Sequence, residues 1–147
     1  MEFRVLPKQQ AFIEACADEV LFGGAAGGGK SYAQMIDVVV YAFLYPKSRQ
    51  LVLRRTFKML EKSLIPLSLE LYSKKIGTYK SSERKWYFCN GSVMEFGYLD
   101  TDTDVTQYMS AEYDVIRFDE LTHFTEYQYT YMLSRLRGAK DYPRSLK

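Results

Sequence analysis

The sequence predicts an α/β protein with a mostly parallel central sheet flanked by helices, and three observations carry this prediction. Short apolar runs typical of strands alternate with longer stretches typical of helices. A glycine-rich segment at 23–29 joins an apolar run to a helical pattern. Asn90-Gly91 lies between two further strand-like runs, and this dipeptide favours a tight hairpin turn. The alternation indicates a parallel sheet, to which the hairpin adds an antiparallel insertion.

The first third of the chain predicts two helices and two strands. A short helix is expected after Pro7, because proline suits the first turn of a helix. The apolar run 20–23 predicts a strand. Apolar side chains recurring at i, i+4, i+7, i+8 and i+11 predict a helix over 31–44 that ends before Pro46. The run 50–54 predicts the next strand.

The middle of the chain predicts a long helical stretch and the hairpin. Residues 57–76 have a helical pattern, and Pro66 is expected to break or kink it, since proline lacks the backbone donor. Segments 85–89 and 92–96 flank Asn90-Gly91 and are expected to pair as antiparallel strands.

The last part predicts one strand between two helical segments. Residues 100–110 read as a loop leading into a short helix, and 114–118 read as a strand. A helix is expected over 125–137, with Gly138 at its end. Thr125 and Gln128 have the spacing of a capping box, in which each side chain bonds the backbone of the other residue.

Length and composition fit one soluble globular domain. The 147 residues are 47% apolar and 26% charged, and no apolar run reaches the length that spans a bilayer. The N-terminus lacks the layout of a signal peptide, so we expect a cytoplasmic protein that is not secreted and has no membrane partner. The net charge of +2 is too small to indicate nucleic acid by itself. Cys16 and Cys89 have no metal-ligand spacing and are expected to be reduced, buried thiols.

Residues 24–31 read G-x-x-x-x-G-K-S, the pattern of a phosphate-binding loop between a strand and a helix. Glycines let successive backbone N–H groups point at a triphosphate, beside the positive end of the helix. The loop residues expected to bind the nucleotide phosphates are Gly24, Ala25, Ala26, Gly27, Gly28 and Gly29. Lys30 is expected to contact the β- and γ-phosphates, and the Ser31 hydroxyl to ligate Mg²⁺. A merely flexible glycine loop is the less favoured interpretation, because a strand and a helix flank the segment.

A second motif lies at 115–120, where an apolar strand ends in two carboxylates. Asp119 would help to hold Mg²⁺, and Glu120 would orient and polarise the attacking water. The pair favours the class of P-loop ATPases with a catalytic glutamate (ASCE type), although solvated loop carboxylates remain the alternative. Arg117 shares a strand face with Asp119, so it either pairs with an acidic neighbour or lies on a strand near the sheet edge.

Four stretches together resemble the large terminase subunit of tailed bacteriophages, the ATP-driven motor that packages DNA. They are 7–12, 23–32, 53–56 and 113–137. The most telling is Tyr-Asp-Val-Ile-Arg-Phe-Asp-Glu-Leu-Thr-His-Phe-Thr-Glu at 113–126. The resemblance implies that residues 1–147 form the first part of a P-loop ATPase domain. It also implies that Tyr32 joins the loop in binding ATP and that Gln9 reads the adenine edge, with an exposed helix-start glutamine as the alternative.

The same resemblance implies function and partners. The expected activity is hydrolysis of ATP, coupled to translocation of double-stranded DNA into a procapsid in the host cytoplasm. The expected assembly is a homo-oligomeric ring that works with a portal protein and a small terminase subunit. Two alternatives remain: a helicase or recombination ATPase on the same core, against which 122–125 argue, and a nucleotide-binding assembly module that does not hydrolyse ATP.

Two departures from the family pattern bear on activity. Only 27 residues follow Glu120, so we expect the last core strands, the coupling motif and the nuclease domain to be absent from this chain. The loop has Ala25-Ala26 where many large terminases have an arginine. We therefore expect Arg137 or Arg135 to supply the transition-state charge from a neighbouring subunit, with Arg54 and Arg55 as the next candidates. The alternative for Arg135 and Arg137 is a favourable interaction with the end of the preceding helix. His123 is expected either to sense the γ-phosphate, to assist Glu120, or to bond locally.

Overall fold

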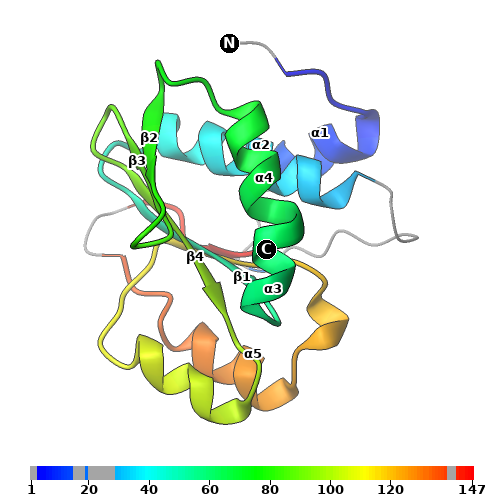
Figure 1. Cartoon of the computed structure of the whole chain (residues 1–147), viewed down its shortest axis with the longest axis vertical. Coiled ribbons are helices and arrows are strands. Elements are labelled where there is room, and N and C mark those ends of the chain that lie inside the picture. Colours follow the sequence, from blue (N-terminus) through cyan, green and yellow to red (C-terminus); the bar gives the residue numbers. More distant parts are fainter. Residues whose placement is uncertain (1–2, 15–18, 20–28, 139–141) are drawn as a thin grey trace.

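A six-stranded sheet forms the centre of the computed structural model, which describes residues 3–14, 19, 29–138 and 142–147 (Figure 1). The strand order is β2-β3-β4-β1-β5-β6. The strands β4, β1, β5 and β6 are parallel, whereas β2, β3 and β4 form an antiparallel meander. Their bounds are Arg49–Arg54 (β1), Gly77–Lys80 (β2), Lys85–Phe88 (β3), Val93–Tyr98 (β4), Val115–Phe118 (β5) and Ser145–Leu146 (β6). The predicted α/β class, the parallel core and the antiparallel hairpin are confirmed.

Helices cover both faces of this sheet. One face is covered by α2 (Lys30–Leu44) and by a continuous helical segment of α3 (Phe57–Met59), η1 (Leu60–Leu64) and α4 (Ile65–Leu71). The other face carries the 3₁₀ helix η2 (Asp102–Tyr108) and α5 (Glu126–Leu133). The helix α1 (Pro7–Glu14) packs against α2, and a short 3₁₀ turn, η3 (Leu121–His123), follows β5.

Side-chain alternation along β1 divides the core into two clusters. Val52 is buried with Met35 of α2 and Phe96 of β4 on one face. Leu51 and Leu53 point to the opposite face and are buried with residues of η2 and α5. Because β1 is buried on both sides, its centre, Leu51-Val52-Leu53, is a continuous apolar run rather than an alternating one. This burial holds the carboxyl ends of β1 and β5 side by side, where the candidate site lies.

Pro66 does not break the helical stretch. The backbone N–H of Ile65 bonds to the carbonyl of Leu60, which makes 60–64 a π-helical turn directly before the proline. Such a turn adjusts the backbone where the normal i to i−4 pattern is interrupted. The helical stretch ends at Leu71 and not at the predicted residue 76. The residues between Leu71 and β2 form the connection to that strand.

Two other local expectations need correction. The last helix ends at Leu133 and not at Arg137, so Gly138 does not cap it. Cys89 is a free thiol, as expected, but it is exposed, because it lies in the hairpin turn beyond β3. Cys16 and the predicted strand at 20–23 lie outside the described residues. The capping box of Thr125 and Gln128 is confirmed, with both reciprocal bonds present.

The strand β6 corrects the expectation that no core strand follows the Asp-bearing strand in this chain. Ser145 and Leu146 pair in parallel with Val115 and Ile116 of β5. Leu146 also forms a parallel bridge with Glu19, which directly precedes the predicted strand at 20–23. β6 therefore lies between β5 and Glu19, and it supplies β5 with a neighbour on the side away from β1. Two residues give too short a pattern for sequence-based prediction of a strand.

Within the described residues, no helix is both long enough and apolar enough to cross a bilayer.

Candidate nucleotide-binding and hydrolysis site

The helix α2 begins with Lys30 and Ser31, directly after a left-handed Gly29. Gly29 has φ +75°, and its carbonyl accepts a hydrogen bond from Ala33 N at 3.0 Å. A Cβ atom at this position would lie 2.3 Å from Gln9 Nε2, so both the backbone angle and the space require glycine. Gly24, Ala25, Ala26, Gly27 and Gly28 lie outside the described residues, so their binding of phosphates stays a prediction. Tyr32 lies half-buried on the first turn of α2.

The two predicted Mg²⁺ ligands lie next to each other. Ser31 Oγ is 3.3 Å from Oδ1 and 3.2 Å from Oδ2 of Asp119. Asp119 follows β5, is buried, and is fixed by a bond from its backbone N–H to Leu53 O at 2.9 Å. A hydroxyl and a carboxylate are oxygen donors of the kind that Mg²⁺ takes together with nucleotide phosphates. Among the described side chains, no group of three His, Cys, Asp or Glu forms a metal site of its own.

Arg54 is the site residue whose position the sequence analysis missed. Its Nε lies 2.6 Å from Asp119 Oδ2, and its NH2 group lies 3.5 Å from Glu120 Oε1. The reason is sheet register: Leu53 of β1 pairs with Phe118 of β5, so the next residue of each strand emerges at the same edge. The signal was present in the sequence as two apolar runs ending in Arg54 and Asp119, but their adjacency depends on strand order.

The carboxylate of Glu120 lies between the side chains of Arg54 and His123. Its Oε2 is 3.1 Å from His123 Nδ1, and its other oxygen faces Arg54. The backbone of Glu120 is left-handed, with φ +57° and ψ +63°, an uncommon conformation for a residue with a side chain. Side chains held in this conformation are often part of functional sites. The predicted link between His123 and Glu120 is thus present, whereas sensing of a γ-phosphate by His123 stays a prediction.

Gln9 connects α1 to the end of the phosphate loop. Its Oε1 accepts from Leu6 N at 2.7 Å, and its Nε2 donates to Gly29 O at 3.0 Å. The side chain is buried, so the alternative of an exposed helix-start glutamine is wrong. Reading of adenine by Gln9 stays a prediction, and the structure adds that the same amide fixes the left-handed turn at Gly29.

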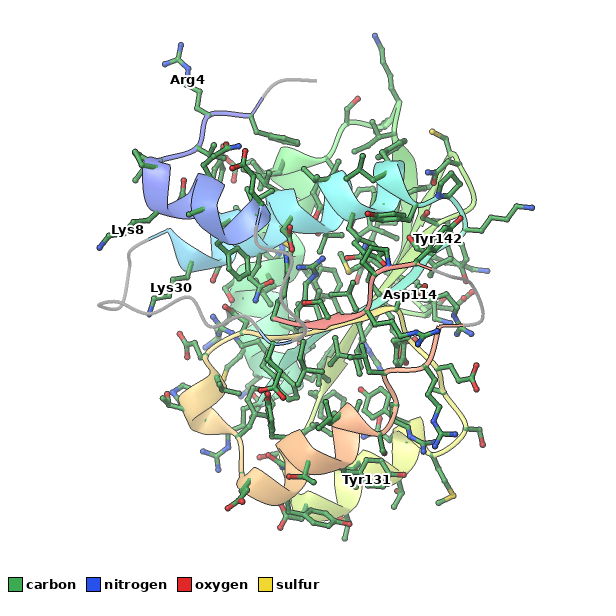
Figure 2. The ribbon with its side chains drawn as sticks, turned by 180° about the vertical axis from the view of Figure 1, so that it is seen from behind. Arg4, Lys8, Lys30, Asp114, Tyr131 and Tyr142 are labelled. Carbon is green, nitrogen blue, oxygen red and sulfur yellow. The ribbon has the colours of Figure 1, made fainter. Side chains whose placement is uncertain are left out.

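Arg135 and Arg137 lie away from this site within one chain. Arg135 follows α5; its guanidinium bonds Met109 O and stacks over Tyr131, and its carbonyl accepts from Tyr113 N at 3.0 Å. Tyr113 and Asp114 precede β5, so they lie at the strand end opposite Asp119. Figure 2 shows Lys30 and Asp114 on opposite sides of the molecule. The geometry therefore does not join either arginine to the carboxylates of its own chain.

Tyr129 links α5 to Glu19, the residue before the predicted strand at 20–23. Its ring packs on Phe118, with centroids 5.4 Å apart. Burial raises the pKa of Tyr129 to about 12, and a hydrogen bond to Glu19 acts in the same direction. The phenol is therefore a stable donor to Glu19 at neutral pH.

The fold is that of an α/β protein of the P-loop NTPase class, with a mostly parallel sheet flanked by helices. A model of the phage terminase large subunit family matches residues 17–146, and the chain belongs to this family. No curated protein matches the sequence.

Solved structures agree on the fold. The large terminase of a thermophilic bacteriophage has a TM-score of 0.75 at 12% identity, over 95% of this chain and 37% of that one. The same protein in complex with ADP has a TM-score of 0.71 at 14% identity, with 95% and 37% covered. The ATPase domain of the Thermus phage P74-26 large terminase has a TM-score of 0.66 at 14% identity, with 90% and 62% covered. The chain thus spans just over a third of the first of these large terminases.

Proposed function

We propose that this chain is an Mg²⁺-dependent ATPase, the motor unit of a phage DNA-packaging terminase. The observation that carries the proposal is the convergence of Ser31 and Asp119 at 3.2–3.3 Å, with Glu120 as the next residue. Ser31 is the second residue of α2, and Asp119 directly follows β5. Family membership and a structural relative in complex with ADP support nucleotide binding.

Each residue has a distinct role in the proposed site. Lys30 and the loop backbone bind the phosphates, while Gln9 and Tyr32 contribute to nucleotide binding. Ser31 and Asp119 would hold Mg²⁺, which neutralises phosphate charge when it is bound. Glu120 orients the attacking water and accepts its proton, and His123 holds the carboxylate of Glu120 at 3.1 Å.

Arg54 occupies part of the carboxylate that is proposed to hold Mg²⁺. Its guanidinium bonds the same Asp119 oxygen that lies closer to Ser31. A metal ion and a guanidinium would compete for this carboxylate, so we expect Mg²⁺ binding to weaken the contact between Arg54 and Asp119. This contact also favours a second candidate function, a nucleotide-binding assembly module without turnover, in which Arg54 stays on Asp119.

Packaging partners follow from family membership as proposals. The ATPase works in a homo-oligomeric ring, in the host cytoplasm, on double-stranded DNA that enters a procapsid through a portal. A small terminase subunit selects the genome. Arg137 or Arg135 of the adjacent subunit completes the site, which is compatible with their distance from Asp119 within one chain.

The decisive experiment measures ATP turnover by the full-length protein with and without Mg²⁺, procapsids and DNA. Turnover that requires Mg²⁺ and rises with procapsids supports the motor. Binding of ATP with no turnover under all conditions supports the assembly module. Stimulation by DNA forks or ends without procapsids supports a helicase or recombination ATPase.

A further inference from the structure

Arg117 is a fully buried cation in the middle of β5, two residues before Asp119. Side chains alternate along a strand, so Arg117 and Asp119 point to the same face, toward α2. Its guanidinium bonds Asp37 of α2 and donates to Gln50 Oε1 of β1 at 2.6 Å from NH2 and 3.2 Å from Nε. Sequence analysis left two options for Arg117: the acidic partner is present as Asp37, and β5 is also next to the last strand, β6, of the described sheet.

The contacts of Arg117 are part of a larger network. Lys147 Nζ binds the same Asp37 oxygen at 2.9 Å, and Gln34 of α2 donates to Lys147 O at 3.3 Å. Gln50 donates to Val38 O at 2.9 Å. Charged and amide groups on α2, β1 and β5, and at the end of β6, are therefore joined in one buried cluster.

Three of these elements, α2, β1 and β5, have residues of the candidate site at or next to one of their ends. Along α2, Asp37 lies six residues from Ser31, or about 9 Å at the helical rise. Along β5, Arg117 lies two residues from Asp119, or about 7 Å. β1 carries Gln50 near its start and Arg54 at its end. A shift of α2 along β5 would change the Asp37–Arg117 contact and the Ser31–Asp119 distance together.

Stability does not explain such a cluster, because apolar side chains of similar volume often replace a buried ion pair without loss. The planar guanidinium does offer something that apolar packing lacks, namely several donors in fixed directions. Here those donors engage α2 through Asp37 and β1 through Gln50 at once. The arrangement specifies one relative position of three elements.

We propose that Arg117 is a positioning residue that sets the register of α2 on β5, and thereby the placement of Ser31 and Asp119 for Mg²⁺. The inference rests on the proposed function, since it concerns the same site. Arg117 does not touch the nucleotide; it acts through Asp37 and Gln50. Residues that hydrogen-bond metal ligands directly change metal affinity or activity by about 10–100-fold when replaced, and Arg117 acts one contact further away, so we expect an effect at the lower end of this range.

The test uses two variants of Arg117 in the full-length protein. Arg117→Lys keeps the buried cation and lacks the planar fork. Arg117→Met removes both, while Lys147 still pairs with Asp37. Calorimetry measures ATP binding across a Mg²⁺ titration, and thermal unfolding measures stability. We expect both variants to need about 10-fold more Mg²⁺ for half-maximal ATP binding, with unchanged ATP affinity in the absence of Mg²⁺.

The control is Phe88→Leu, a change on β3, two strands from β1, in the apolar cluster that also contains Val38 and Met35 of α2. Phe88→Leu is expected to lower stability without changing the Arg117 network.

An equal Mg²⁺ shift in Phe88→Leu, or no shift in Arg117→Lys and Arg117→Met, overturns the positioning role. If Arg117→Lys responds to Mg²⁺ like the wild type while Arg117→Met does not, the buried charge and not the planar guanidinium is responsible, and the positioning role is also overturned. If Arg117→Met does not fold, Arg117→Lys alone decides. Wild-type protein that fails to bind Mg²⁺ and ATP would instead remove the proposed function.

Discussion

Arg54 and Asp119 form a buried ion pair, Nε to Oδ2 at 2.6 Å, at the position where the metal ligand of a P-loop ATPase is expected. The side chains are 10% and 4% exposed. The pair joins the ends of β1 and β5, so the candidate site holds its own cation in this arrangement. Mg²⁺ held by Asp119 would compete with Arg54 for this carboxylate, and this competition leads to the first prediction.

Arg54→Ala should destabilise the nucleotide-free protein and ease Mg²⁺ binding. Removing one partner of a buried ion pair leaves the other charge uncompensated, at a cost of about 3 kcal/mol. We expect denaturant unfolding in EDTA to detect this loss, and addition of Mg²⁺ with ATP to reverse most of it.

The matched control for Arg54→Ala is Arg55→Ala. Arg55 is 51% exposed and lies 3.9 Å from Asp100, so its loss should cost about 0.5 kcal/mol or less. Equal destabilisation by both variants would show that the Arg54–Asp119 pair does not hold the end of β1.

Lys30→Ala should weaken ATP binding and abolish turnover in the full-length protein. A cation that binds the transferring phosphate in a water-poor site is expected to contribute about 10²–10³-fold or more to kcat. Steady-state phosphate release and equilibrium ATP binding measure the two effects. Turnover at the wild-type rate would refute the assignment of the loop.

Glu120→Gln should bind Mg²⁺ and ATP but lose hydrolysis by about 10²–10⁴-fold, because the amide keeps the shape of the side chain and lacks its basicity. Single-turnover measurements with bound ATP separate this step from binding.

Asp119→Asn should instead weaken Mg²⁺ dependence and ATP binding together, because this carboxylate lies against Ser31. If Asp119→Asn and Glu120→Gln lose binding equally, the roles of metal ligand and water activator are divided wrongly between the two residues.

Arg137→Ala or Arg135→Ala should lower the procapsid-stimulated ATPase rate, and mixing should restore part of it. An arginine supplied from a neighbouring subunit contributes about 10³–10⁵-fold where it is used. A ring of Arg137→Ala and Glu120→Gln subunits can hold sites with one intact Glu120 and one intact Arg137, so mixed rings should exceed either variant alone. If neither arginine variant changes the rate, Arg54 and Arg55 become the next candidates.

The sequence predicted the elements whose signals are local. The phosphate loop, the apolar strand before Asp119 and the Thr125–Gln128 capping box each depend on neighbouring residues, and the last two are present as expected. The contact of Ser31 with Asp119 was predictable because the two motifs together imply one metal site.

The remaining features depend on contacts between distant segments. The Arg54–Asp119 pair requires that β1 and β5 be neighbours in parallel, and periodicity does not specify strand order. Arg117 was recognised as unusual, but its partner on α2 was not identifiable from a single sequence. The two-residue strand β6 depends on backbone bonds to β5 and its preceding residue. Ser145 N donates to Asp114 O, and Lys147, directly after β6, bonds Ile116 and Phe118, whereas the residues of β6 carry no strand pattern.

The left-handed backbone of Glu120 affects how inactive variants should be made for trapping ATP-bound rings. β-branched side chains are strained at φ +57°, so Glu120→Val or Glu120→Ile would perturb η3 as well as the chemistry. Glu120→Gly would relieve the strain and loosen the turn. Asn tolerates this backbone region, and Gln preserves side-chain length. Comparing Glu120→Gln with Glu120→Asn therefore separates the effect of a missing carboxylate from the effect of a displaced loop.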